Sequence, residues 1–203
     1  MKNANTLYNK IVLASNNQGK VREISQMVAE LEIEVVPQSD FNVPDADETG
    51  LSFVENAILK ARQAAQLTGL PAIADDSGIE VDYLKGAPGI YSARYSGIGA
   101  TDQQNLDKML LALKDVPAAQ RLARFQCLMV FMRHADDPTP FIAQGTWQGV
   151  ITETASGDNG FGYDPIFYVP EHNCTSAQLS SEIKNSLSHR GQALKKLINF
   201  LGQ

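Results

Sequence analysis

Hydrophobic runs that alternate with helical patterns constrain the fold of this chain more than any other feature. The run Lys10–Ala14 has the apolar residues of a buried strand. A helical pattern follows and predicts an amphipathic helix from Gln18 to about Glu30. The apolar positions of that pattern are Val21, Ile24, Val28 and Leu31. Ile33–Pro37 then predicts a second strand, ended by proline, and this strand–helix–strand order is typical of an α/β protein.

The next segment contains a second helix and an acidic turn. Gln38–Gly50 is polar and predicts a loop. Ser52 followed by Glu55 is a capping-box signature, which opens a helix that runs to about Thr68 and is closed by Gly69 and Pro71. Two short strands are predicted at Ala72–Ala74 and Ile79–Val81, and they flank the turn Asp75-Asp76-Ser77-Gly78.

The second half of the chain predicts a glycine-rich segment, two long strands and two helices. Residues 85–100 are irregular, and a helix follows from about Asp102 to Lys114. The long strands are Arg121–Arg133 and Phe141–Thr154, and the last helix carries Leu194, Leu197, Ile198 and Leu201 on one face. The chain contains no repeat and no linker, so we expect a single domain over residues 1–203, an α/β unit with two lobes and a cleft between them.

Composition and charge exclude several classes of protein. Apolar residues make up 43% and charged residues 20% of the 203 positions, as in ordinary globular proteins. A net charge of −6 argues against a nucleic-acid partner but allows a small phosphorylated ligand. Cys127 and Cys174 match no metal or redox spacing, which indicates a reducing compartment. With a polar start and no apolar run of roughly 20 residues, we expect no membrane contact and a cytoplasmic location.

The first candidate motif lies between the first strand and the first helix, at Ser15-Asn16-Asn17-Gln18-Gly19-Lys20. A helix start offers unpaired N–H groups and partial positive charge to an anion. Lys20 adds a mobile cation for phosphate oxygens, although the motif lacks the glycines and the Lys-Ser/Thr ending of a Walker A loop. The motif therefore predicts a phosphate-binding loop, with a plain capped turn as the alternative.

The second candidate is a set of three carboxylates: Glu48, Asp75 and Asp76. Magnesium takes one or two carboxylates and leaves its other positions to water and phosphate. Successive side chains of an extended chain point to opposite faces, so only one of the adjacent aspartates need face the metal. A carboxylate can also deprotonate water for attack on phosphorus. The alternative is an ordinary solvated turn.

Two further motifs fit the recognition of a base. The glycines of Gly160-Phe161-Gly162-Tyr163-Asp164-Pro165 can leave an aromatic ring exposed for stacking on a base. Lys184 and Ser188-His189-Arg190-Gly191 supply cationic and ionisable donors near a helix start, which suit the O6 and N7 acceptors of a 6-keto purine. An aromatic that anchors a loop and surface charges beside a helix are the alternatives. Together, the four motifs are the parts that a nucleotide hydrolase requires.

With these motifs in this order, the chain resembles the inosine triphosphate pyrophosphatase family, whose enzymes hydrolyse non-standard purine nucleoside triphosphates. The resemblance covers Lys10 to the C-terminus. Besides the motifs above, it includes Glu48-Thr49-Gly50, Phe53 to Ala61 and Ala87 to Arg94. It implies a long mixed central sheet flanked by helices, two lobes with a deep active-site cleft, and a homodimer.

The resemblance also implies a role for each motif. Asp76 matches the proton acceptor and a magnesium ligand, and Glu48 matches a second acidic residue at that site. Ser15, Asn16, Asn17, Gln18, Gly19 and Lys20 match the triphosphate loop, and Ser77 sits beside it. Phe161, Gly162, Tyr163, Asp164, Lys184, His189 and Arg190 match the base and sugar pocket. Lys60 matches a lysine near the phosphates, and the resemblance does not assign Asp75 to the metal or to the turn.

We therefore expect a Mg²⁺-dependent nucleoside-triphosphate pyrophosphatase that converts ITP, dITP and XTP to the monophosphate and diphosphate. Two other classes remain open: a pyrophosphatase of pyrimidine or methylated nucleotides, and a non-catalytic nucleotide sensor. Turnover of a panel of substrates distinguishes the first class from the expected enzyme. Phosphate release measured with and without magnesium distinguishes the second class from it.

Overall fold

A computed structural model describes residues 8–28 and 33–202 of the chain. The end of the predicted first helix at Glu30, with its apolar Leu31, lies outside these residues, as does most of the polar start. The chain divides into two compact units. Unit 1 comprises Met1–Asp76, Cys127–Gly145 and Arg190–Gln203, and unit 2 comprises Ser77–Gln126 and Thr146–His189.

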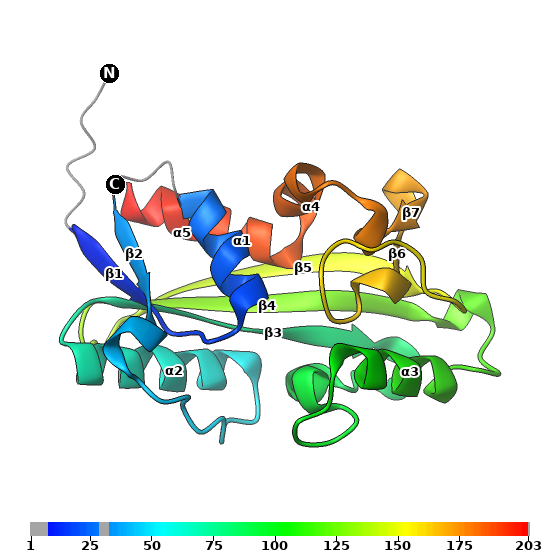
Figure 1. Cartoon of the computed structure of the whole chain (residues 1–203), viewed down its shortest axis with the longest axis horizontal. Coiled ribbons are helices and arrows are strands. Elements are labelled where there is room, and N and C mark those ends of the chain that lie inside the picture. Colours follow the sequence, from blue (N-terminus) through cyan, green and yellow to red (C-terminus); the bar gives the residue numbers. More distant parts are fainter. Residues whose placement is uncertain (1–7, 29–32, 203) are drawn as a thin grey trace. The chain divides into compact units, whose positions relative to one another are not determined.

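The strands form a mixed sheet, which confirms the predicted α/β class (Figure 1). Its order is β2-β1-β3-β4-β5-β6-β7. The strands are β1 (Lys10–Leu13), β2 (Glu34–Pro37), β3 (Ala72–Val81), β4 (Leu122–Met132), β5 (Phe141–Ile151), β6 (Phe167–Val169) and β7 (Cys174–Thr175). β1 runs parallel to β2 and β3, whereas β6 is antiparallel to β5 and β7. The deep cleft stays a prediction.

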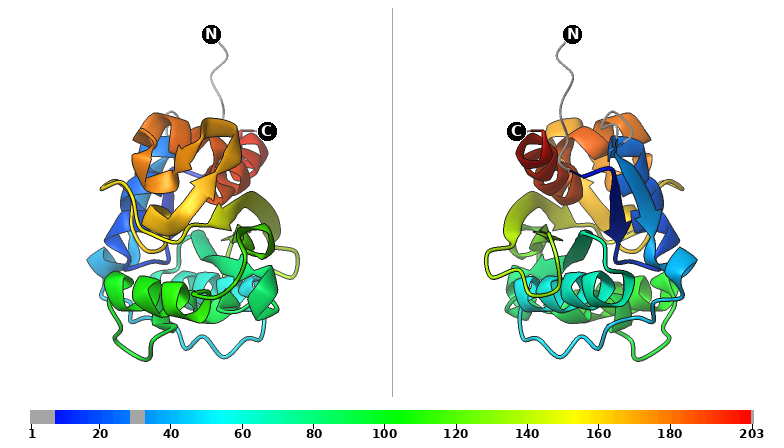
Figure 2. Two further views of the ribbon diagram at one scale, coloured as in Figure 1. Left: turned by 90° about the vertical axis from the view of Figure 1, so that its right-hand side faces the viewer. Right: turned by 90° about the vertical axis from the view of Figure 1, so that its left-hand side faces the viewer.

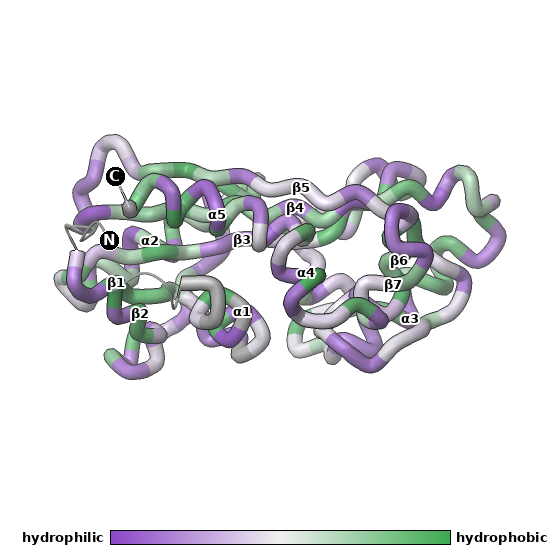
Figure 3. Tube along the Cα trace, turned by 90° about the horizontal axis from the view of Figure 1, so that it is seen from above, coloured by the Kyte–Doolittle hydropathy of each residue, from purple (hydrophilic) through white to green (hydrophobic). Residues whose placement is uncertain are grey.

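In unit 1, helices cover both faces of the strands. Figure 1 shows α2 (Phe53–Thr68) on one side of β1, with α1 (Gln18–Val28) and α5 (His189–Leu201) on the other, and the right-hand view of Figure 2 shows the same separation. Alternate residues of β1 feed two cores, because side chains of a strand alternate between faces. Ile11 and Leu13 pack with α1 and α5, and Val12 packs with the alanines of α2. Figure 3 shows this apolar run of β1 in green.

The acidic motif of β3 is not a turn, and this part of the sequence prediction is wrong. Ala72–Val81 is one continuous strand that contains Asp75 and Asp76. Both aspartates are buried, at 1% and 6% exposure. The two carboxylates do not need water to stabilise their charge, because a cationic side chain contacts each of them. Because side chains of a strand alternate between faces, Asp75 and Asp76 point to opposite faces of the sheet in unit 1.

Helix α2 begins and ends where the sequence predicts. Ser52 caps it: its hydroxyl accepts from the backbone N–H of Glu55 and donates to Oε2 of Glu55 at 2.7 Å. Gly69 ends it in the left-handed conformation, at φ 69°, which glycine adopts without strain. The buried face of α2 consists mostly of alanines, so the helix lies close to the strands.

Unit 2 has its own hydrophobic core, built around parts of β3, β4 and β5. Ile79, Phe125 and Trp147 pack there with Phe167 and with residues of α3 (Asp102–Ala112). Two strands and one α-helix of this unit are not predicted by the sequence: β6, β7 and α4 (Ser181–Leu187). They span two to seven residues, too few for a strand or helix period to stand out. Among the described residues, no helix has the length and apolar character that a membrane span requires.

Candidate active site

Asp75 lies on the face of β3 that meets α1 and α5. Its Oδ2 atom is 3.1 Å from Nζ of Lys20 and 3.4 Å from Nη2 of Arg190. Burial raises the pKa of this carboxyl, but the charges of Lys20, Arg190 and Lys60 outweigh burial and hold the pKa well below its usual range. Asp75 is therefore a buried anion that holds two cations in place.

Asp76 lies on the opposite face of β3, toward α2. Lys60 donates to its Oδ1 atom at 2.7 Å, and Nδ2 of Asn56 lies 3.4 Å from Oδ2. Burial raises the pKa of Asp76, and the charge of Lys60 offsets only part of this effect. A carboxylate with a raised pKa is a better proton acceptor near neutral pH. The two neighbouring aspartates thus have different partners and opposite pKa shifts.

Lys60 contacts three oxygen atoms of unit 1, one from the loop before α2 and two from adjacent residues of β3. Its Nζ is 2.8 Å from Oε1 of Glu48, 2.7 Å from Oδ1 of Asp76 and 3.2 Å from the carbonyl oxygen of Asp75. Burial lowers the pKa of Lys60, but the charges of Asp76, Asp75 and Glu48 outweigh it and the net shift is upward. Lys60 is therefore kept in its protonated, positively charged form.

The oxygen donors at Lys60 fit a magnesium ion. Carboxylates of Glu48 and Asp76 lie within hydrogen-bonding distance of a single nitrogen, so both can reach one small cation. Magnesium binds through one or two carboxylates and takes its other ligands from water and phosphate. In the described part of the chain, no group of three or more acidic, histidine or cysteine side chains forms a metal cage. The site therefore suits a metal that shares its coordination with a phosphorylated ligand.

The loop before α1 is arranged as a helix N-terminus. Oδ1 of Asn17 accepts from the backbone N–H groups of Gly19 and Lys20, and Oγ of Ser15 accepts from the N–H of Asn17. Nδ2 of Asn16 donates to Asp45 at 2.8 Å. The side chain of Gln18 lies outside the described residues. The capped turn of the alternative interpretation is present, and phosphate binding by this loop stays a prediction. Lys20 lies in the first turn of α1, where it reaches Asp75.

In unit 2, Asp164 lies in the predicted motif of residues 160–165 and links that motif to Lys184. It accepts from the backbone N–H of Phe161, from Oγ of Ser176 and from Nζ of Lys184, each at 2.8 Å. Nζ of Lys184 also lies 5.1 Å from the centre of the Phe161 ring, which is within cation–π distance. These contacts bring Lys184 to Phe161 and Asp164, although it lies 20 residues beyond Asp164 in the sequence.

The other residues of that motif have structural contacts within unit 2. The backbone N–H of Gly162 donates to Asp102 at 2.8 Å. The hydroxyl of Tyr163 donates to the carbonyl oxygen of Ser92 at 2.8 Å, and the side chain is 5% exposed. Tyr163 therefore anchors the loop in the core of unit 2. Ser77 follows Asp76 in β3 as a half-buried residue.

His189 and Arg190 begin α5 and are buried, at 5% and 3% exposure. Their interpretation as surface charges is therefore wrong. The His189 ring stacks on Phe125, with ring centres 4.7 Å apart and an interplanar angle of 9°. Arg190 belongs to unit 1, where it contacts Asp75. The structure thus groups Arg190 with Lys20, and His189 with the core of unit 2.

Asn56 is a site residue that the sequence prediction missed. It is fully buried, its Oδ1 accepts from the N–H of Gly50 at 2.8 Å, and its Nδ2 is directed at Asp76. It therefore links the loop of Glu48 to Asp76. A polar residue four positions before Lys60 on the alanine face of a predicted helix was the available signal, since residues at that spacing share a face.

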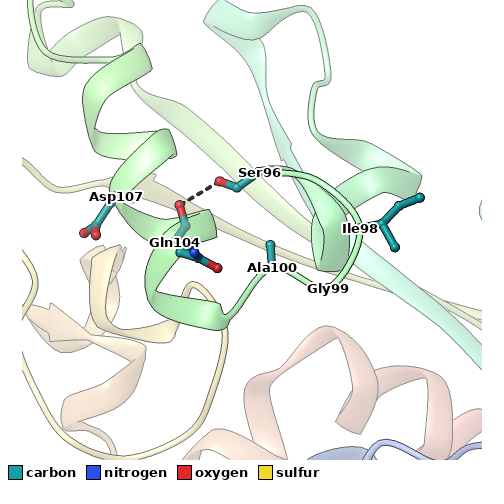
Figure 4. A pocket seen from close by; sticks show the side chains of 6 residues that line it. All are labelled: Ser96, Ile98, Gly99, Ala100, Gln104 and Asp107. Carbon is teal, nitrogen blue, oxygen red and sulfur yellow. Dashed lines mark hydrogen bonds between the residues drawn. The ribbon is translucent and has the colours of Figure 1, made fainter.

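A separate hollow of unit 2 contains none of the predicted site residues (Figure 4). It is lined by Ser96, Ile98, Gly99, Ala100, Gln104 and Asp107. The hydroxyl of Ser96 donates to the carbonyl oxygen of Gln104 at 2.7 Å across it.

The fold and the clusters define a class: an α/β protein with paired carboxylates and lysines beside a helix N-terminus. Known proteins narrow that class. A model of the Ham1 family matches residues 11–200, so this chain belongs to the Ham1 family. It is 63% identical to a dITP/XTP pyrophosphatase of Vibrio cholerae over 192 residues, which cover 95% of this chain and 96% of the relative.

Other relatives give the same result. A dITP/XTP pyrophosphatase of Pectobacterium atrosepticum is 61% identical, with 95% of this chain and 98% of the relative covered. The solved structure of a HAM1 protein from Coxiella burnetii is 50% identical and superimposes with a TM-score of 0.88, covering 95% of this chain and 98% of that one. The mixed sheet with flanking helices is therefore that of known Ham1 structures.

Proposed function

We propose that this protein hydrolyses the non-standard purine nucleoside triphosphates dITP, ITP and XTP to the monophosphate and diphosphate. Its close similarity to proteins named dITP/XTP pyrophosphatases supports this activity. The observation that carries the proposal is the cluster around Lys60, in which the carboxylates of Glu48 and Asp76 converge on one nitrogen. Such a cluster, with Lys20 in the same unit, suits a polyphosphate with its metal ion.

In this proposal, Asp76 and Glu48 hold Mg²⁺, which when bound supplies positive charge to phosphate oxygens. Asp76 accepts the proton of the water that attacks the α-phosphorus. The bond from the α-phosphorus to the oxygen bridging to the β-phosphorus breaks, and diphosphate leaves. The raised pKa of Asp76 supports its role as base, because a carboxylate of ordinary pKa is a weaker proton acceptor.

The triphosphate is assigned to Ser15, Asn16, Asn17, Gln18, Gly19 and Lys20, and Ser77 is assigned to the substrate beside Asp76. The first turn of α1 supports this assignment, because a helix N-terminus favours anions. Asp75 orients Lys20 through its ion pair, so we assign it to positioning and not to the metal.

The base and sugar are assigned to Phe161, Gly162, Tyr163, Asp164, Lys184, His189 and Arg190. Donors from histidine and arginine suit the O6 and N7 acceptors of hypoxanthine and xanthine, and adenine presents a donor where O6 would lie. Guanine is also a 6-keto purine. Rejection of GTP therefore requires a feature that disfavours its 2-amino group.

We further propose that residues 1–203 act as one pyrophosphatase domain, in a cytoplasmic homodimer without a nucleic-acid partner. The family match over residues 11–200 supports one functional unit. The net charge of −6 supports the absence of a nucleic-acid partner, since such a partner attracts a basic surface.

The test is kcat/KM for dITP, ITP, XTP, GTP, ATP and dCTP under one condition, with products separated by ion-exchange chromatography. We expect monophosphate and diphosphate from the first three substrates and much slower turnover of the others. Chelation of metal with EDTA should abolish turnover, and added Mg²⁺ should restore it. Comparable turnover of dCTP would indicate a pyrimidine nucleotide pyrophosphatase, and binding without turnover would indicate a sensor.

A further inference from the structure

Lys60 lies where a metal ion would have to bind. Its ammonium contacts Oε1 of Glu48 and Oδ1 of Asp76 at 2.8 and 2.7 Å, and these are the two side chains assigned to magnesium. The ammonium also contacts the carbonyl oxygen of Asp75 at 3.2 Å. A cation that already lies between two ligands must leave at least one of them before a second cation binds both.

These ion pairs are shielded from solvent. The side chains of Lys60, Glu48 and Asp76 are 15%, 27% and 9% exposed. Salt and water screen such charges less than they screen surface pairs. The attraction between Lys60 and the carboxylates therefore competes directly with their attraction for a metal ion.

Asp76 has less freedom to move than Lys60, because its side chain is shorter and the buried side chain of Asn56 contacts it. Asn56 is fully buried in α2, its Nδ2 is directed at Oδ2 of Asp76, and its Oδ1 is fixed by the N–H of Gly50. Lys60 reaches the same carboxylate through a flexible four-carbon chain. When a metal ion binds, Lys60 is therefore the group that can move while Asp76 stays in place.

We propose that Lys60 and a divalent cation compete for Glu48 and Asp76, so that the protein binds metal weakly until a triphosphate is present. The phosphate oxygens then offer the displaced ammonium a new partner, and metal and nucleotide favour each other's binding. This inference rests on the proposed function, because it takes Glu48 and Asp76 as the metal ligands.

The test is the affinity of the full chain for Mn²⁺ without nucleotide, measured by electron paramagnetic resonance of the free ion. Lys60→Met removes the competing charge, so the Kd for Mn²⁺ should decrease, by roughly the 5- to 150-fold that is typical of linked binding events. Isothermal titration with Mg²⁺ should show a change in the same direction.

Lys10→Met is a matched control. Lys10 also belongs to unit 1 and pairs with an acidic residue, at 3.0 Å from Glu34. Its loss changes the net charge by the same amount, and the Kd for Mn²⁺ should change by less than about twofold if only the local charge matters. Circular dichroism verifies the fold of each variant. Lys60→Gln, which stays polar, replaces Lys60→Met if the latter does not fold.

An unchanged or higher Kd for Mn²⁺ in folded Lys60→Met or Lys60→Gln would overturn the inference. An equal decrease in Lys10→Met would also overturn it, since the effect would then be general electrostatics. Hydrolysis of dITP by the unsubstituted protein distinguishes failure of this inference from failure of the proposed function. If that activity is present but the Kd does not change, only the role of Lys60 fails, whereas absence of activity with every divalent metal contradicts the proposed function.

Discussion

Adjacent aspartates in β3 have separate environments because one residue of extended chain reverses the direction of the side chain. Asp75 contacts Lys20 and Arg190, and Asp76 contacts Lys60. The alternation could be predicted from the sequence. The partners could not, because each comes from a helix whose packing side is fixed by tertiary contacts.

Replacement of Asp76 by asparagine tests its role as proton acceptor. Asp76→Asn keeps the shape of the side chain but removes its basicity, so kcat for dITP should fall by roughly 10²- to 10⁴-fold. Binding of nucleotide, measured by isothermal titration with EDTA present, should change little. Near-normal kcat would exclude Asp76 as the base.

Replacement of His189 tests the recognition of the base. His189→Ala removes a donor that suits a 6-keto purine, so the ratio of kcat/KM for ITP over ATP should fall by up to roughly tenfold, about the contribution of one hydrogen bond. Arg190→Ala should act in the same direction, but it also leaves buried Asp75 with one cation fewer. An unchanged ratio in both variants would place the recognition of the base elsewhere.

Among the elements, α2 was predicted almost fully, whereas β3 was interpreted as two strands and a turn. The Ser52 cap, the alanine pattern and Gly69 are local signals that act within one turn of helix. The burial of Asp75 and Asp76 depends on cations that are distant in the sequence. Local turn propensity therefore predicts the wrong structure for these residues. β6 and β7 are too short to show a period.

The cap of α2 supports the helix that carries Asn56 and Lys60. Ser52→Ala removes the acceptor for the N–H of Glu55 and should cost about 1 kcal/mol of unfolding free energy. We expect a Tm lower by roughly 2–4 °C in calorimetry, which is the usual shift for a chain of this length. Ser52→Thr retains the hydroxyl and should keep most of the Tm, and equal losses in both variants would exclude capping as the cause.

The connection between β4 and β5 contains a carboxylate whose effect on stability depends on pH. Hydrogen bonds from the Arg133 side chain and from the backbone N–H groups of Arg133 and Thr139 hold the pKa of Asp137 well below its usual range, despite burial. A depressed pKa stabilises the folded state above the unfolded pKa of about 3.9, and the effect is lost as pH falls through the folded pKa. Asp137→Asn should therefore lower the Tm at pH 7, and the difference should shrink below about pH 4. A constant difference from pH 7 to pH 3 would exclude the charge as its origin.

At the scale of the whole molecule, the sequence predicts a set of candidate site residues but not which of them contact one another. The motifs and the family resemblance name Lys20, Glu48 and Asp76, and all three lie in unit 1. Lys60 joins Glu48 to Asp76 there, and Lys20 contacts Asp75. The contact of Asn56 with Asp76 and that of Arg190 with Asp75 are not predicted by the sequence. Such contacts depend on how three helices, α1, α2 and α5, pack against β3. This packing cannot be predicted from any single segment of the sequence.

The proposed homodimer is tested at this scale. Size-exclusion chromatography with light scattering should give a mass of twice the 22.1 kDa of one chain. The mass should stay the same across a tenfold dilution into the low micromolar range if the interface is of the obligate kind. The mass of a single chain at every concentration would contradict the dimer.

The separate partners of Asp75 and Asp76 also restrict which mutations of this chain can be tolerated in evolution. A point substitution in β3 alters one carboxylate and leaves the other with its partners. Insertion or deletion of one codon between Ala72 and Asp75 would instead reverse the facing of both aspartates, since each residue of a strand inverts the side. Lys20 and Lys60 would then each meet the wrong acid, so gene variants that lengthen or shorten this strand should be absent from functional descendants.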